Sequence, residues 1–207
     1  MRHYITKQPW QTNSRPAPKC LLSTQSGRDA QLSQTFSHAV SICARVNIVL
    51  RRLQPADTRD YLEVHRAAVR GTAARDYPPN VIESWAPLPI TDTAVEAARA
   101  NPDGEIRVGA LVRGALVGVG AVIPRLCELR ACYVVPQKGR TGVGRTIVIE
   151  LETIARAEGA PFLIVESSLT ALPFYMVLGY EVLRRGEHIL DSGAAMSAVI
   201  MRKSLAT

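Results

Sequence analysis

The stretch VVPQKGRTGVGRTIVIELETIARAEG, residues 134–159, constrains the fold most, because it joins a strand end, a glycine loop and a long amphipathic helix. Pro136 ends the apolar extended run, since it has no backbone donor. Apolar residues then recur with helical spacing from Val143 to Ala155. A glycine loop that opens a helix presents amide N–H groups at the positive end of the helix dipole. The sequence therefore predicts a phosphate or pyrophosphate site at this loop.

Three kinds of loop bind phosphates in this way, and the residue spacing separates them. The dinucleotide fingerprint GxGxxG fails, because Ile147 stands where a third glycine or alanine belongs. The phosphate loop of nucleotide kinases, GxxxxGK[ST], nearly matches Gly139–Thr146, but Arg145 replaces its lysine. That loop also belongs to an early parallel βαβ unit, whereas this one follows a predicted antiparallel hairpin. A P-loop-type nucleotide-binding enzyme is the less favoured alternative.

The third kind of loop fits best. The sequence VVP at 134–136, followed by GVG at 142–144, resembles the coenzyme A loop of the GCN5-related N-acetyltransferase (GNAT) family. Gly139 departs from that pattern, because it stands where the family has Gln or Arg. The side-chain contact made from that position is therefore missing, and Gln137 or Arg140 are its candidate substitutes.

The resemblance implies acetyl-CoA as co-substrate. The pantetheine arm would add to the sheet as a partial strand, bonded to backbone groups near Tyr133 and Val135. The amide groups of the glycine loop would hold the pyrophosphate. The implied cofactor-binding residues before and within the loop are Tyr133, Val134, Val135, Lys138, Gly139, Arg140, Gly142, Val143 and Gly144.

A second motif lies beyond the loop at the distance that the family requires. The sequence SSLTALPFYMVLGY, residues 167–180, looks like the family signature Asn/Ser-x-x-Ala-x-x-Phe-Tyr-x-x-x-Gly-Phe/Tyr. The resemblance implies that Ser168 and Ala171 contact the cofactor and that Tyr175 protonates the leaving thiolate. A tyrosine with a pKa near 10 suits this role, because thiols ionise near 8.5. The alternative is a half-buried tyrosine packed beside Phe174.

An acceptor amine is protonated at neutral pH, so something must take its proton before it attacks. Glu128 lies 14 residues before Gly142, at a place comparable to the strand glutamate that histone-type members of the family use as the base. Glu166, at the end of the neighbouring predicted strand, is the rival. Tyr77 and Trp85 fall where the family builds the wall of its acceptor site, although such a pair is also typical of a core.

The order of the predicted elements is typical of a mixed α/β fold, because an antiparallel meander precedes a parallel crossover. It matches the GNAT acyl-CoA N-acyltransferase fold: a central, mostly antiparallel sheet with one parallel, splayed strand pair and helices on both faces. Strands are predicted at 46–53, 105–112, 115–123, 127–135, 162–165, 180–184 and 194–201, and helices at 58–70, 77–85 and 170–178. A long helix starts at 143 and is ended by Gly159, and 91–100 is a further helix or an extended turn.

The chain divides into a basic segment and a nearly neutral remainder. Residues 1–45 hold six of the 25 Lys and Arg residues and one of the 18 acidic residues. They show no sustained periodicity, which predicts a disordered leader, a targeting segment or an over-long gene model. Residues 46–207 form the predicted acetyltransferase domain, whose charge balance argues against a nucleic-acid-binding face.

Composition narrows the remaining classes. The four cysteines form no CxxC pair, which favours reduced thiols and a cytoplasmic protein. The four histidines show no metal-ligand spacing, and His188 falls in a predicted late loop, so no metal is expected. No run approaches the roughly 18 apolar residues of a membrane helix.

These observations favour an N-acetyltransferase that moves an acetyl group from acetyl-CoA to a primary amine by direct attack. The acceptor would be a small molecule or a peptide, and the sheet edges of the family commonly support a homodimer. A non-catalytic acyl-CoA-binding or regulatory module is the main alternative, because the Gln or Arg side chain is missing at Gly139.

Overall fold

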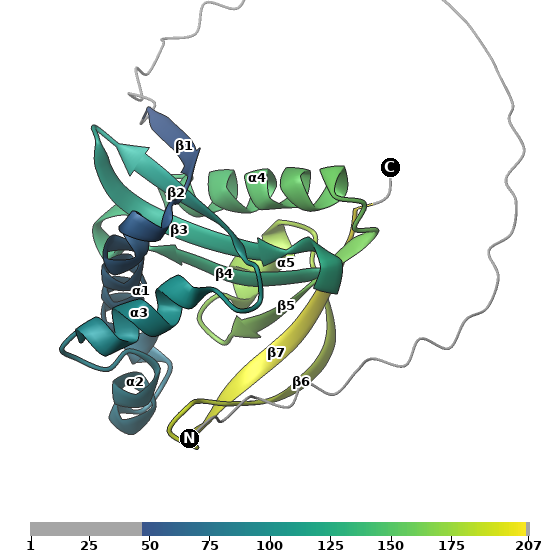
Figure 1. Cartoon of the computed structure of the whole chain (residues 1–207). Helices are drawn as coiled ribbons and strands as arrows, with labels where there is room; N and C mark the ends of the chain where they lie inside the picture. The colour runs from purple at the N-terminus through teal and green to yellow at the C-terminus, as the bar shows by residue number, and fades with distance from the viewer. Residues whose placement is uncertain (1–46, 206–207) are drawn as a thin grey trace, which may run out of the picture. The chain divides into compact units, whose positions relative to one another are not determined.

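One seven-stranded sheet forms the centre of the computed structural model, which describes residues 47–205 (Figure 1). The predicted leader, residues 1–45, lies outside the described residues. The strands are β1 (Ile48–Arg52), β2 (Ile106–Val112), β3 (Ala115–Ile123), β4 (Glu128–Val134), β5 (Phe162–Ser168), β6 (Glu181–Ile189) and β7 (Ala195–Ser204). The helices are α1 (Thr58–Thr72), α2 (Pro79–Trp85), α3 (Asp92–Ala100), α4 (Val143–Ala157) and α5 (Leu172–Val177).

The strand order is β1-β2-β3-β4-β5-β7-β6, and every neighbouring pair is antiparallel except β4 and β5. The β2–β3 hairpin turns at Arg113 and Gly114, which have φ angles of 52° and 81°. Two consecutive positive φ angles are what a tight two-residue hairpin turn requires. The predicted mixed α/β sheet with one parallel pair is confirmed.

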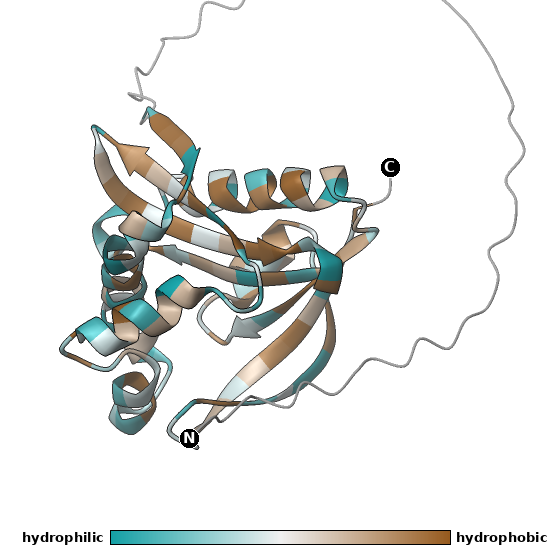
Figure 2. Cartoon of the chain, viewed as in Figure 1, coloured by the Kyte–Doolittle hydropathy of each residue, from teal (hydrophilic) through white to brown (hydrophobic). Residues whose placement is uncertain are grey.

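Helices cover both faces of the sheet (Figure 1). Helix α4 lies against one face, and α1, α2 and α3 gather on the other. Apolar and polar stretches alternate along α4 (Figure 2), and its apolar side, which includes Ile147 and Leu151, is fully buried. A second apolar cluster joins α1 and α2 to β7 through residues that include Val69, Ile82 and Met196. No helix within residues 47–205 has the length and apolarity needed to cross a membrane.

The contact between α4 and β3 depends on a glycine. A Cβ atom added at Gly120 would lie 2.4 Å from Cγ2 of Ile147 and 2.8 Å from Cδ1 of Leu151. We therefore expect Gly120→Val to lower the free energy of unfolding by about 1–3 kcal/mol, because overpacking forces side chains and backbone apart. Urea unfolding measures this. Ala115→Val is the matched control, since Ala115 is exposed at the start of the same strand, and its change should stay within about 0.5 kcal/mol. Equal effects of the two substitutions would contradict this account of the packing.

A β-bulge in β4 opens the sheet. Ala121 faces Ala131 and Val122 faces Leu129, so Arg130 is an extra residue in β4. Such a bulge bends its strand and increases the local twist. The pairing of β4 with β5 ends at Leu129↔Val165, immediately before the bulge. Beyond this point β4 and β5 diverge, and the gap between them forms the candidate site.

Strand β6 is longer than the sequence indicates. It was expected at 180–184, but it extends to Ile189, so His188 lies on a strand and not in a loop. The strand lies at the edge of the sheet, and much of it is exposed. Charged residues are normal on edge strands. The alternation of apolar and polar residues that predicts a strand is therefore missing here, because the segment contains Arg184, Arg185 and Glu187.

Candidate active site

A cavity of about 660 Å³ lies where β4 and β5 diverge. Its walls come from both strands, from the glycine loop before α4, from α5, and from α1 with the end of α2. The predicted site residues that line it are Tyr133, Val134, Lys138, Gly139, Arg140, Gly142, Gly144, Ser168, Ala171 and Tyr175. The two sequence motifs therefore meet in one cavity.

The backbone of β4 offers hydrogen-bonding groups to this cavity. The N–H of Val135 donates to the carbonyl of Val117 on β3, at 2.9 Å. Residues of an antiparallel strand alternate in the side toward which they bond, so Tyr133 also bonds toward β3. Contrary to expectation, the amide of Val135 is thus already paired. The backbone groups of Cys132 and Val134 face the diverging β5 instead.

The glycine loop has fewer available amides than the motif suggests, because two of the predicted donors are already paired. The N–H groups of Lys138 and Gly139 donate to the carbonyls of Val135 and Pro136, at 2.9 and 3.0 Å. Because this short 3₁₀ turn uses both N–H groups, neither can bind the diphosphate as predicted. Arg140 and Gly142 then adopt φ angles of 59° and 89°, which turn the chain into α4.

Helix α4 supplies the remaining donors. Its first internal hydrogen bond runs from the N–H of Thr146 to the carbonyl of Gly142, at 3.0 Å. The N–H groups of Val143, Gly144 and Arg145 therefore have no partner within the helix. Arg145 was not predicted to contribute its amide, although any residue at the third position of a helix presents one. The amides of this first turn, together with the helix dipole, suit an anion.

Charge and shape around this end of the cavity also fit a diphosphate. The basic side chains of Arg75, Lys138, Arg140 and Arg145 belong to residues that line the cavity. A Cβ atom at Gly144 would lie 3.3 Å from Cζ of Phe174 on α5, so a larger residue would push α5 away from the loop. The close approach of backbone and aromatic ring explains the second glycine of the motif.

Tyr175 lies in the wall of the cavity, between two other aromatic rings. Its ring centroid lies 5.1 Å from that of Phe174 and 5.4 Å from that of Tyr180, and only 4% of the residue is exposed. Burial raises the pKa of the Tyr175 hydroxyl well above its ordinary value of 10. The hydroxyl therefore keeps its proton at neutral pH. Ser168 supports this wall, because its Oγ accepts a hydrogen bond from the N–H of Ala171 just before α5.

Aromatic side chains line the face of the cavity that α1 and α2 cover. The ring of His65 on α1 lies 4.5 Å from that of Tyr133, and Trp85 lies 6.4 Å from both. Tyr133 and Trp85 line the cavity, as the acceptor-wall prediction for Trp85 requires. Burial, and then the charge of Arg66, lowers the pKa of His65 to about 4. The His65 ring is thus neutral at physiological pH.

The half-buried His65 predicts an acid-sensitive fold. Its pKa rises from about 4 in the folded state to about 6.5 in the unfolded state, so the unfolded chain binds the proton more readily. The stability that the neutral ring provides is complete above pH 6.5 and is lost as pH falls toward 4. We expect wild type to lose ~3 kcal/mol more than His65→Phe between pH 7 and pH 4. Denaturant unfolding at both pH values measures the difference, and parallel losses would contradict it.

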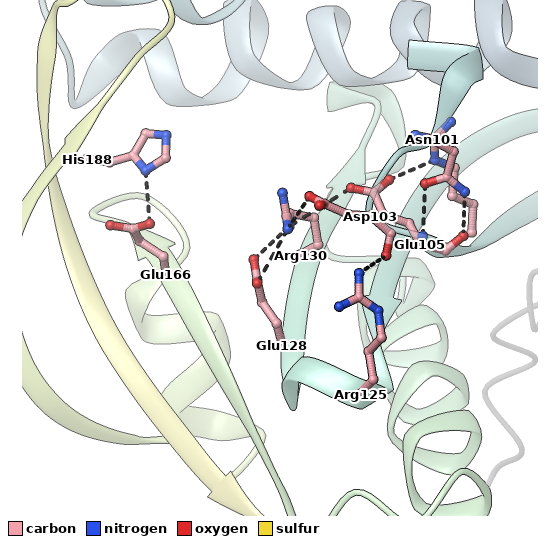
Figure 3. A network of polar contacts seen from close by, with 9 residues as sticks. Asn101, Asp103, Glu105, Arg125, Glu128, Arg130, Glu166 and His188 are labelled. Carbon is pink, nitrogen blue, oxygen red and sulfur yellow. Dashed lines mark hydrogen bonds and ion pairs between the residues drawn. The ribbon is translucent and has the colours of Figure 1, made fainter. Parts of the chain in front are cut away.

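Arg130 forms ion pairs with two carboxylates at the rim of the cavity (Figure 3). Nε of Arg130 lies 2.6 Å from Oε1 of Glu128, and its Nη2 lies 3.0 Å from Oδ2 of Asp103. Arg130 lines the cavity, whereas Glu128 lies beside its guanidinium at the end where β4 and β5 still pair. The predicted base is therefore held in an ion pair with a residue of the cavity wall.

The rival base, Glu166, lies across the cavity from Arg130 (Figure 3). Its Oε2 lies 2.9 Å from Nδ1 of His188. The sequence placed Glu166 near the site but could not identify its partner, because His188 is 22 residues away on β6. Hydrogen bonding to Glu166 raises the pKa of His188 above its ordinary value of 6.5. Among residues 47–205, no group of three or more metal-ligand side chains comes together.

The comparisons with known proteins agree with the geometry. A family model described as the acetyltransferase (GNAT) domain matches residues 73–205. This chain belongs to the GNAT acetyltransferase family. The suspected family, the fold and the assignment as an acyltransferase are therefore confirmed. No curated protein matches the chain.

Solved structures similar to this GNAT domain include several acetyltransferases. A GCN5-related N-acetyltransferase from Rhodopseudomonas palustris is 27% identical with a TM-score of 0.68, covering 75% of this chain and 94% of its own. The PaiA N-acetyltransferase of Thermoplasma acidophilum, solved with coenzyme A, is 20% identical (TM-score 0.56; 76% and 99% covered). The putative acetyltransferase YncA of Salmonella typhimurium, solved with acetyl-CoA, is 18% identical (TM-score 0.57; 78% and 95% covered). Below 25% identity the likeness is one of fold.

Proposed function

We propose that this protein transfers an acetyl group from acetyl-CoA to a primary amine of a small molecule or peptide by direct attack. The observation that carries the proposal is the position of Tyr175 in the same cavity as the unpaired amides of α4. One end of the cavity offers donors for a diphosphate, and the wall beyond offers a protonated phenol. Two neighbours solved with coenzyme A or acetyl-CoA support this co-substrate.

Different residues along the cavity bind different parts of acetyl-CoA. The N–H groups of Val143, Gly144 and Arg145 hold the diphosphate, with the basic side chains around them. The backbone of Cys132 and Val134 receives the pantetheine arm as a partial strand. With the donor held in this way, the thioester would lie near Tyr175 and Phe174 in the cavity wall. The main contribution of the chain is thus orientation of the donor.

The chemical step needs one nucleophile and the movement of three protons. The neutral amine attacks the thioester carbonyl carbon, a C–N bond forms and the C–S bond breaks. Tyr175 donates its proton to the departing sulfur, so that a thiol leaves in place of a thiolate. The amine gives up two protons in total: one passes to a base before the attack, and one leaves as the amide forms and restores the proton of Tyr175. Binding and orientation precede this step, and no metal is required for the proton balance.

A release assay tests the proposal. Purified protein is mixed with acetyl-CoA and a panel of primary amines, and free thiol is measured together with the acetylated product. Thiol release that depends on the amine, with an equal yield of acetylated amine, supports the proposal. Binding of coenzyme A without any release across the panel would instead select a non-catalytic acyl-CoA-binding module. The absence of a Gln or Arg side chain at Gly139 is the feature that favours this second candidate.

A further inference from the structure

Glu166 and His188 form a hydrogen-bonded pair in which Glu166 lines the cavity, and neither residue has a role in holding the donor. Glu166 on β5 is opposite Ile200 on β7, and His188 on β6 is opposite Met196 on β7. Ile200 and Met196 are separated by an even number of residues, so both members of the pair lie on the same face of the sheet. Met196 belongs to the cluster beneath α1 and α2, which identifies this face as the one lined by Trp85 and Tyr133.

The pair connects the cavity to solvent. Glu166 lines the cavity, and 41% of its side chain is exposed. His188 lies behind it with 38% exposed. A proton received by the carboxylate at the cavity wall can therefore pass through Nδ1 of His188 to Nε2 and then to water. The charged groups that act on His188 are Glu166 on β5, Asp191 in the β6–β7 turn and Arg130 on β4.

We propose that Glu166 and His188 together accept the proton that the acceptor ammonium must lose before it attacks. This rests on the proposed amine acetylation. A lysine-like amine is neutral in only about one molecule in 10³ at pH 7, so a base beside it raises the reactive fraction. The ammonium N–H bond breaks, its proton moves to the Glu166 carboxylate and onward to His188, and the nitrogen keeps the electron pair for the carbonyl carbon. Glu166 is the group that touches the amine, and His188 is its positioning and proton-storing partner.

The alternative base, Glu128, is less well placed for this task. Its carboxylate is held 2.6 Å from Nε of Arg130 (Figure 3), and Glu128 does not line the cavity, whereas Glu166 does. The Glu166 carboxylate lines the cavity, and its Oε2 lies 2.9 Å from Nδ1 of His188. An ammonium in the cavity therefore meets a carboxylate with an imidazole behind it.

The test is the pH profile of kcat/KM, measured by thiol release from acetyl-CoA with the most active amine of the panel. Wild type should gain activity as pH rises through the pKa of His188, above 6.5. Glu166→Gln should lower kcat by about 10²-fold with little change in the KM for acetyl-CoA. His188→Asn keeps a side-chain donor for Glu166 but cannot take up a proton. Its profile should therefore lack the acidic limb, which is the rise of kcat/KM with pH seen in wild type. It should retain more of kcat than His188→Ala does.

Glu187→Gln is the matched control, because Glu187 precedes His188 on β6 and points to the opposite face. Its profile should equal that of wild type. Nuclear magnetic resonance titration of His188 provides a second measurement, and its pKa should fall toward 6.5 in Glu166→Gln. An unchanged acidic limb in both Glu166→Gln and His188→Asn would overturn the proposal, as would loss of the limb in Glu128→Gln alone. Those results would leave the proposed amine acetylation intact. A wild-type protein that releases no thiol would refute both the acetylation and the role of Glu166 and His188.

Discussion

Tyr175→Phe is expected to lower kcat by about 10²-fold and to leave the KM for acetyl-CoA nearly unchanged. The substitution removes only the hydroxyl from a residue that is 4% exposed, and the ring keeps its contacts with Phe174 and Tyr180. Without the phenolic proton, the sulfur must leave as a thiolate or take its proton from water. Steady-state kinetics at several acetyl-CoA concentrations separate kcat from KM.

Tyr180→Phe is the matched control for this measurement. Tyr180 is also buried, and its ring lies 5.4 Å from that of Tyr175, but the charge of Glu152 acts on its hydroxyl. It does not belong to the residues that line the cavity. Removal of this hydroxyl should therefore leave kcat within about twofold of wild type. Equal losses in the two variants would show that packing, and not proton donation, explains the effect of Tyr175→Phe.

Gly142→Asp is expected to weaken coenzyme A binding by at least about 10²-fold. Gly142 is the residue before α4, and an aspartate there would place a carboxylate beside the N–H groups of Gly144 and Arg145. These are the donors that the diphosphate needs, and the new carboxylate would also repel it. Each lost hydrogen bond to a charged group costs about 1.5–3 kcal/mol, which is a factor of 10 or more. Isothermal titration calorimetry with coenzyme A measures the change.

Two controls separate the electrostatic effect from a change of loop shape. Gly142→Asn places a neutral cap of the same size at the same φ of 89°, so the difference between Asp and Asn reports the charge. Pantetheine lacks the diphosphate, and its weak binding should be the same in wild type and Gly142→Asp. A loss of pantetheine binding equal to that of coenzyme A would indicate that the loop had collapsed.

The parts of this structure that depend on local sequence were predictable. The helix from Val143 to Ala157 follows from its apolar period, and the glycines before it place its first turn. The signature around Tyr175 likewise brings α5 to the same cavity. In both cases the information lies within about 15 neighbouring residues, where spacing determines which side chains and amides share a face.

The parts that depend on pairing between strands were not predictable from the sequence. The bulge at Arg130 exists because Ala131 and Leu129 face consecutive residues of β3, and no single strand records that register. The same bulge determines where β4 and β5 separate. The Glu166–His188 contact joins residues on strands separated by β7, and the polar composition of β6 concealed that His188 belongs to a strand.

The glycine-loop motif also did not predict which amide groups are available to bind an anion. The family pattern assigns anion contacts to consecutive positions, but a 3₁₀ turn uses the amides of Lys138 and Gly139 for its own hydrogen bonds. Pro136 begins that turn, because its fixed φ suits the first position and it needs no donor there. Two of the predicted donors are therefore used within the loop, and Arg145 becomes part of the site through its backbone.

The most direct test of the central claim is a calorimetric titration of the full chain with coenzyme A and, separately, with Mg-ATP. The unpaired amides of α4 and the diverging strands predict clear saturable heat for coenzyme A and no tight binding of Mg-ATP. Tight binding of Mg-ATP without measurable binding of coenzyme A would contradict the account, since the loop would then serve a nucleotide and Tyr175 would have no thiolate to protonate.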